Sequence, residues 1–244
     1  MSRPPPKAMT MTTTNTARTV GAASASTCDP ATRVTRSLLG YGVLAGPVYV
    51  TASLVQALTR PGFDLSRHEW SLLADGPHGW IQITNLALTG AMVLAFAVGL
   101  RRALADGPAA RWAPRLIGVY GASLVAAAAF RADPAFGFPA GTLDGPGPVS
   151  WHGMLHLLSG AVGFTALAVA CFVIARRNAR EGRRVPAVLA RATGIIFLLG
   201  FGAVAAGAGR PAANLVFTAA VIIVWAWLAV VALDRYRHAG ASAQ

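Results

Sequence analysis

The sequence predicts an all-α fold, a polytopic membrane bundle of six transmembrane helices with both termini in the cytoplasm. Its composition is typical of a membrane protein: of 244 residues 55% are hydrophobic, the mean hydropathy is +0.53 and only 12% are charged. Soluble domains usually have about 25% charged residues. Six apolar segments follow one another along the chain, each near the ~20 residues that a helix needs to cross a bilayer. The arginines gather in alternate connections between these segments, as the positive-inside rule requires.

The six apolar segments are predicted to be helices. A strand of a membrane β-barrel would be about half as long and would alternate in polarity, which none of these segments does. The segments cover about residues 37–58, 81–100, 114–130, 151–175, 187–208 and 212–233. We therefore expect one transmembrane domain over residues 37–233, between a disordered basic cytoplasmic tail at 1–36 and a short cytoplasmic tail at 234–244.

The first 36 residues are rich in Thr, Ala, Ser, Pro and Arg and have no apolar periodicity, which predicts disorder. The apolar core of a secretory signal does not occur before Leu38, so we expect the tail to be retained. Two cysteines cannot build a disulfide framework. Cys28 lies in the tail and Cys171 lies in a predicted span, so both are expected to be free thiols.

Basic residues predict the orientation. The tail, the second-to-third connection, the fourth-to-fifth connection with the start of the fifth span, and the C-terminus hold 17 of the 21 basic residues; the others are Arg60, Arg67, Arg131 and Arg210. The positive-inside rule places the larger group in the cytoplasm, which agrees with an even number of spans. We expect a multi-pass protein of the cell inner membrane, whose partners are the lipid bilayer and anionic lipid headgroups on the cytoplasmic side. The net charge of +12 then needs no nucleic-acid partner, and none is expected.

The first outer connection has the most distinctive local pattern. Ser71 begins an apolar stretch that predicts a short helix lying at the surface, closed by Asp75 and Gly76. Just beyond it, polar side chains on the second span should face the bundle interior, because lipid offers them no hydrogen-bond partner. These are Gln82, Asn85 and Thr89.

A polar pocket is predicted at the outer membrane surface. His152 and His156 open the fourth span four residues apart, so they share one helix face. Asp133 follows the third span, and the first outer connection brings His68 and Ser71 to the same side. The candidate catalytic residues are His152, His156, Asp133, His68 and Ser71. The candidate metal ligands are His152, His156, Asp133 and His68.

Three stretches carry a family resemblance: RPGFDLSRHEWSLLADGPHGW after the first span, FRADPAFGFP after the third, and WHGMLH opening the fourth. Together they resemble the six-span bacterial and archaeal membrane family catalogued as domain of unknown function 998, over about residues 38–233. The matching positions are His68, Ser71, Phe130, Asp133, Pro134, His152, Gly153 and His156. The family has no established activity. The resemblance therefore implies an architecture and the place of a site, without implying a reaction.

Two functional interpretations remain open, and the sequence does not decide whether the chain is an enzyme. In one, the polar residues form a hydrogen-bonded clasp between the outer loops and the bundle, which leaves a structural role or the sensing or carriage of a small amphiphilic ligand. In the other, they hold zinc or another divalent metal and hydrolyse a lipid or amphiphilic substrate at the outer leaflet. The resemblance of that set to ceramidase-like membrane hydrolases is analogy only. The oligomeric state is left open.

Two further classes are disfavoured. Two histidines at positions i and i+4 of one helix cannot both be axial ligands of one haem iron, so no bound cofactor of that kind is predicted. Proton-coupled transport usually needs an ionisable group near the middle of the membrane, and no acid or base lies at mid-span.

Overall fold

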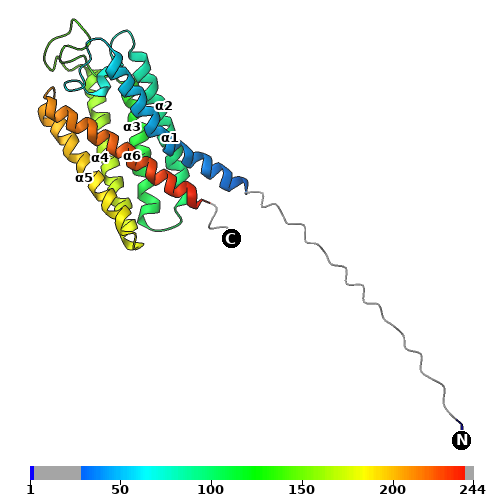
Figure 1. Ribbon diagram of the computed structural model, residues 1–244. Coiled ribbons are helices and arrows are strands. Elements are labelled where there is room, and N and C mark those ends of the chain that lie inside the picture. The colour runs from blue at the N-terminus through cyan, green and yellow to red at the C-terminus, as the bar shows by residue number, and fades with distance from the viewer. Residues whose placement is uncertain (3–28, 240–244) are drawn as a thin grey trace.

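The computed structural model describes residues 1–2 and 29–239. These residues form six α-helices and one short 3-10 helix, and no β-strand occurs among them (Figure 1). The elements in chain order are α1 (Pro30–Thr59), the 3-10 helix η1 (Trp70–Ala74), α2 (Gly79–Ala103), α3 (Pro108–Ala129), α4 (Trp151–Arg180), α5 (Arg184–Gly207) and α6 (Pro211–His238). The predicted all-helical fold is confirmed. The predicted disordered tail lies outside the described residues for the most part, at residues 3–28.

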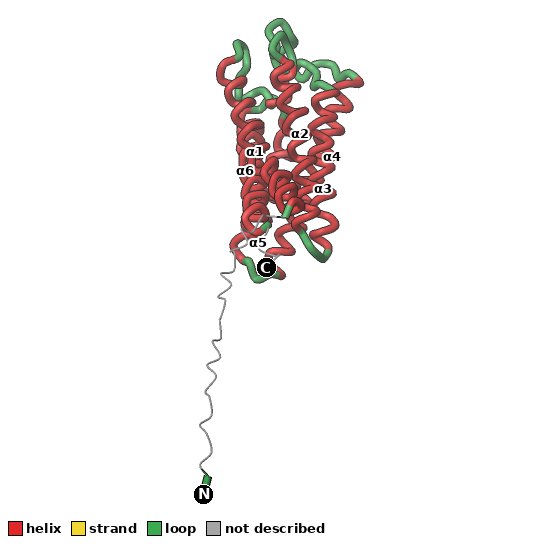
Figure 2. The backbone as a smooth tube through the Cα atoms, turned by 90° about the vertical axis from the view of Figure 1, so that its right-hand side faces the viewer, coloured by secondary structure: helices red, strands yellow, loops and turns green. Residues whose placement is uncertain are grey.

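The helices form a closed ring. Each packs against the next along the chain, and α6 returns to pack against α1. Figure 2 shows that the two long connections, residues 60–78 and 130–150, gather at one end of the bundle, while α1 begins and α6 finishes at the other. We call these the loop end and the terminal end. Three of the five connections are short, and short connections favour contact between consecutive antiparallel helices.

Five of the six helices are long and apolar enough to cross a membrane: α1, α2, α4, α5 and α6. The chain is thus a multi-pass membrane protein. The remaining helix, α3, has 22 residues and packs between α2 and α4. It carries Arg111 and Arg115 in its first two turns and many small residues after them, and this composition lowers its hydropathy.

The helices extend beyond the predicted apolar spans, chiefly at the terminal end. The first helix, α1, begins at Pro30, seven residues before the first predicted span. Its first turns are held by Arg36, which donates a hydrogen bond from Nε to the Ala239 carbonyl (2.8 Å) and lies over the Tyr236 ring. Hydropathy identifies only the part of a helix that suits hydrocarbon, so the polar turns beyond it are missed.

Small residues allow the helices to approach closely. A side chain at Gly163 on α4 would overlap the hydroxyl of Ser123 on α3, so this crossing requires glycine. As predicted, the polar side chains of α2 face the interior: Gln82, Asn85 and Thr89 are all buried. Gln82 Oε1 accepts a hydrogen bond from Gln56 Nε2 of α1 at 2.9 Å. Amide pairing of this kind satisfies polar groups that lipid cannot.

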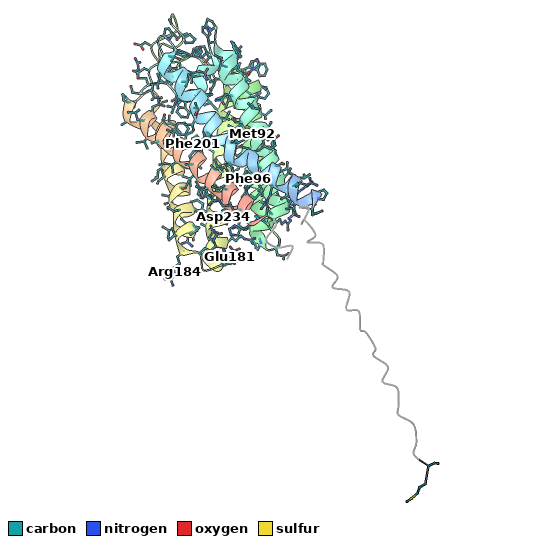
Figure 3. All side chains as sticks on the ribbon, turned by 45° about the vertical axis from the view of Figure 1, so that its right-hand side comes forward. Met92, Phe96, Glu181, Arg184, Phe201 and Asp234 are labelled. Atoms are coloured by element: carbon teal, nitrogen blue, oxygen red, sulfur yellow. The ribbon has the colours of Figure 1, made fainter. Side chains whose placement is uncertain are left out.

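The terminal end carries the ion pairs that join α5 to α6. Arg183 at the start of α5 donates to both carboxylate oxygens of Asp234, at 2.7 and 3.2 Å. Figure 3 places Asp234, Glu181 and Arg184 together at this end, far from Phe201. These charged groups therefore lie at the terminal edge of the bundle, and the buried polar side chains of the six helices are uncharged amides and hydroxyls.

Candidate functional site

A cavity of about 570 Å³ lies inside the ring at its loop end. All six helices and both long connections contribute to its lining. Along α4 the lining runs from Gly153 to Phe164, which corresponds to a depth of about 17 Å at the helical rise of 1.5 Å per residue. This volume lies within the range of about 300–1,000 Å³ that accommodates most small-molecule ligands.

The carboxylates and the histidine of the cavity lie at its mouth, and hydroxyl side chains of α3 and α6 also line it. Glu69 and Ser71 come from the first long connection, Asp133 from the second, and His156 from the first turns of α4. No arginine or lysine of the described chain lines the cavity. Burial raises the pKa of the Glu69 carboxyl above its usual value, although a backbone hydrogen bond partly opposes this effect. The mouth is therefore acidic in a chain whose net charge is +12.

The deep part of the cavity is aromatic and aliphatic. Phe164 of α4 meets Phe197 and Phe201 of α5 edge to face, each with ring centroids 5.3 Å apart, and Phe217 of α6 lies 5.6 Å from it. Tyr49 and Tyr120 also line the cavity, and they contact the buried Trp225 at centroid distances of 5.1 and 5.6 Å. Such a wall suits a hydrocarbon chain.

The cavity is open on one side of the bundle. Five of its lining residues are classed as exposed, and all of them lie on the loop-end halves of α4 and α5 or just before α4. They are Pro146, Val149, Leu157, Ala205 and Ala208. Leu157 is 59% exposed although it lines the cavity. These exposed residues thus place the opening at the loop-end halves of α4 and α5.

Asp133 is held at the N-terminus of α4. Its Oδ2 accepts a hydrogen bond from the Ser150 backbone N–H at 2.7 Å, and its Oδ1 accepts one from the Ser150 hydroxyl at 2.6 Å. The Ser150 hydroxyl also caps the helix, because it accepts from the Gly153 N–H at 3.1 Å. A side chain at residue 153 would overlap the Asp133 carboxylate, so glycine is required there. A negative charge at this helix terminus is favourable.

His156 is the histidine that faces the cavity. Its Nδ1 lies 2.8 Å from the Phe130 carbonyl, which can only accept, so Nδ1 carries the proton in this contact. Among the described residues Nε2 has no hydrogen-bond partner. His156 thus presents an acceptor nitrogen at the mouth.

His68 instead joins the two long connections. It is 3% exposed, and its Nδ1 accepts from the Asp64 backbone N–H at 2.8 Å while Nε2 lies 3.0 Å from the Phe136 carbonyl. Its ring packs on Phe63 and Phe138 at centroid distances of 5.2 and 5.5 Å. Both ring nitrogens are hydrogen-bonded to backbone groups, so His68 ties one long connection to the other.

The predicted pocket is therefore assembled in part. Asp133, His156 and Ser71 line the cavity together, whereas His68 does not, and His152 is exposed with its ring against Trp151. Within residues 1–2 and 29–239, no three His, Cys, Asp or Glu side chains converge as a metal site would require. The four predicted metal ligands are thus not brought together, because one binds two backbone groups and one faces outward.

Sequence reasoning missed Glu69 as a lining residue and missed the phenylalanine wall. The signal for Glu69 is its place directly before the apolar stretch WSLLA, which forms η1. The prediction that this short helix lies at the surface is wrong: Trp70, Leu72, Leu73 and Ala74 are buried. Because these residues of η1 pack inside the bundle, Glu69 and Ser71 lie at the cavity. The phenylalanines are spread over three helices, and no local pattern distinguishes them from ordinary core residues.

Comparisons with known proteins support the family resemblance. Residues 43–234 match the family described as "Protein of unknown function (DUF998)", which covers most of the chain. Neither the curated proteins nor the solved structures gave a match. The matched residues contain the whole cavity and nearly all of the six helices. The chain therefore belongs to DUF998, a family of membrane proteins of unknown function.

Proposed function

We propose that this protein crosses the cytoplasmic membrane six times with its loop end outside, and that its cavity binds one amphiphilic molecule from the outer leaflet, as a sensor or carrier would. The concentration of arginine at the terminal end supports this orientation. The length of α3 and its place between two apolar helices support a sixth span.

The observation that supports a binding function is that the cavity has a polar mouth and an aromatic deep part. Polar groups lie at the mouth, namely Glu69, Asp133 and His156, and rings such as Phe164 and Phe201 line the deep part. An amphiphile has the same division between head and chain. A few convergent polar groups in a largely apolar pocket are typical of ligand sites. The opening at the loop-end halves of α4 and α5 supports access from lipid, since Leu157 and Ala205 there are exposed.

Binding can be tested with the purified full-length chain in lipid nanodiscs and radiolabelled hexadecanol, a neutral single-chain probe. We expect saturable binding of one molecule per chain. The variant Ala161→Phe should lower the affinity, because Ala161 lines the cavity and a phenyl ring would fill it. Val162→Phe is the matched control, since Val162 is 50% exposed and does not line the cavity. Binding that never saturates, or that both variants change equally, would refute the proposal.

A hydrolase acting on an amphiphile is the second candidate, and the free Nε2 of His156 favours it. A neutral imidazole nitrogen facing the cavity mouth can act as a general base toward water. Incubation with a radiolabelled long-chain ester distinguishes the two functions. Release of the labelled acid, lost in His156→Gln, would support hydrolysis. Recovery of intact ester supports binding alone.

A further inference from the structure

The charge of the cavity mouth specifies the head group of the ligand. Glu69, Asp133 and His156 are the titratable groups of the mouth, and no described cation lines the cavity with them. Of the three arginines of the long connections, Arg131 does not line the cavity and the other two are engaged elsewhere. Arg67 pairs with Asp144 at 2.9 Å, and Arg60 donates to the carbonyls of Leu73 and Asp75. An anionic head would therefore meet two carboxylates without a cation to balance them.

Glu69 differs from Asp133 and Asp64, two other acids of the long connections. Asp133 accepts two hydrogen bonds from Ser150, and Asp64 accepts from the N–H and hydroxyl of Ser66, at 2.8 and 2.7 Å. Among the described residues no side chain donates to the Glu69 carboxylate or forms an ion pair with it. A half-buried carboxylate that lines a cavity and has no side-chain partner is a candidate for binding a cation.

The aromatic surroundings of Glu69 suit the same head group. Trp70, the next residue, is 5% exposed and also lines the cavity, with its ring 5.8 Å from that of Tyr49. Ammonium groups are attracted to the faces of indole and phenol rings. A cavity lined by this carboxylate and by the indole ring therefore offers an ammonium group both charge attraction and cation–π contact.

We propose that the cavity selects a single-chain amphiphile with an amine head, for which Glu69 is the counter-ion. This inference rests on the proposed binding function and gives the chemical class of its ligand. The ammonium group lies at the mouth against Glu69 and Trp70, and the alkyl chain extends along Phe164 and Phe201. Long-chain fatty acids and anionic lipids are excluded by the acidic mouth.

The test compares three probes of equal chain length in the same nanodiscs: hexadecylamine, hexadecanol and palmitate. We expect the amine to bind about 10-fold more tightly than the alcohol, as a charge-assisted contact typically provides, and palmitate to bind more weakly than either. Partition into nanodiscs without protein is subtracted for each probe. In Glu69→Gln the ratio of the amine affinity to the alcohol affinity should fall to about one. Saturable binding of hexadecanol by the variant shows that it is folded with its cavity intact.

Asp144→Asn is the matched control, because it removes one negative charge from the long connections at a residue that does not line the cavity. It should leave the preference for the amine intact. Equal affinities of the unmutated protein for amine and alcohol would overturn this inference and leave the binding function standing. Absence of saturable binding for all three probes would refute the binding function itself. A tenfold preference that persists in Glu69→Gln would assign the selection to another group.

Discussion

The Asp133 carboxylate accepts two hydrogen bonds from Ser150, one from the backbone N–H at 2.7 Å and one from the hydroxyl at 2.6 Å. This pair joins the long α3–α4 connection to the N-terminus of α4. It also places a negative charge at the positive end of the helix dipole. The pair is therefore both a cap for α4 and one wall of the cavity mouth.

Replacing Asp133 by alanine should destabilise the protein by about 1 kcal/mol or somewhat more, the usual range for loss of a helix cap. Both hydrogen bonds to Ser150 and the favourable charge would be lost. Thermal unfolding in detergent measures the change. Asp144→Ala is the control, because its side chain is 81% exposed in a surface ion pair, and it should have little effect. Equal losses in the two variants would contradict a capping role.

Gly153→Ala should also destabilise the protein, for a steric reason. The added methyl group would overlap the Asp133 carboxylate. The two substitutions are therefore expected to be non-additive: once Asp133 is alanine, the methyl group at residue 153 has room. A double-mutant cycle measured by thermal unfolding detects this coupling. Strictly additive losses of stability would show that the Gly153→Ala effect does not come from contact with the Asp133 carboxylate.

His68→Ala should loosen the two long connections. The imidazole hydrogen-bonds the Asp64 N–H and the Phe136 carbonyl, and it packs against Phe63 and Phe138. Losing these contacts should cost about 3 kcal/mol, combining a core truncation with two unsatisfied backbone groups. Limited proteolysis should cut within residues 60–78 or 130–150 faster than in the unmutated protein. His152→Ala provides the control, since its exposed ring contacts Trp151 without bonding either connection.

Much of the architecture could be predicted from the sequence, because a long apolar segment by itself indicates a membrane-spanning helix. The amides of α2 illustrate this: Gln82 and Asn85 had to face inward, and they do. Helix ends were predicted less well, since Pro30 begins α1 in a polar stretch where hydropathy gives no signal.

The site was harder to predict, because it depends on how the two long connections fold over the ring. His68 and His156 look alike in the sequence. One has both nitrogens bound to backbone groups, and the other keeps one nitrogen free at the cavity. Only the fold of residues 60–78 and 130–150 separates these roles. The burial of η1, which brings Glu69 to the mouth, likewise depends on packing against α1 and α2.

Purified protein should hold no stoichiometric zinc. His68 uses both ring nitrogens, Asp133 uses both oxygens on Ser150, and His152 faces away from the cavity. Zinc sites need at least three protein ligands in suitable geometry. Elemental analysis after purification without chelators measures the content. One zinc per chain, lost in His156→Ala, would contradict this expectation and favour the hydrolase.

The Asp75 carboxyl should make the protein less stable as the pH rises through a mildly acidic range. Burial raises the pKa of Asp75 from 3.8 to about 6; Arg131 and Arg60 oppose the rise, and Asp133 adds to it. Asp75 is 5% exposed, and its Oδ2 has no hydrogen-bond partner. Between these two pKa values the folded protein binds more protons than the unfolded chain, so the free energy of unfolding falls as the pH increases.

Asp75→Asn isolates this contribution, because the amide resembles the protonated acid in shape and cannot ionise. Its melting temperature should equal that of the unmutated protein at about pH 4 and exceed it at about pH 7, where the unmutated carboxylate is buried and charged. Asp144→Asn, measured in parallel, should show no such divergence, since Asp144 is exposed. A lower melting temperature for Asp75→Asn at neutral pH would mean that Arg131 and Arg60 stabilise the charged carboxylate more than burial penalises it.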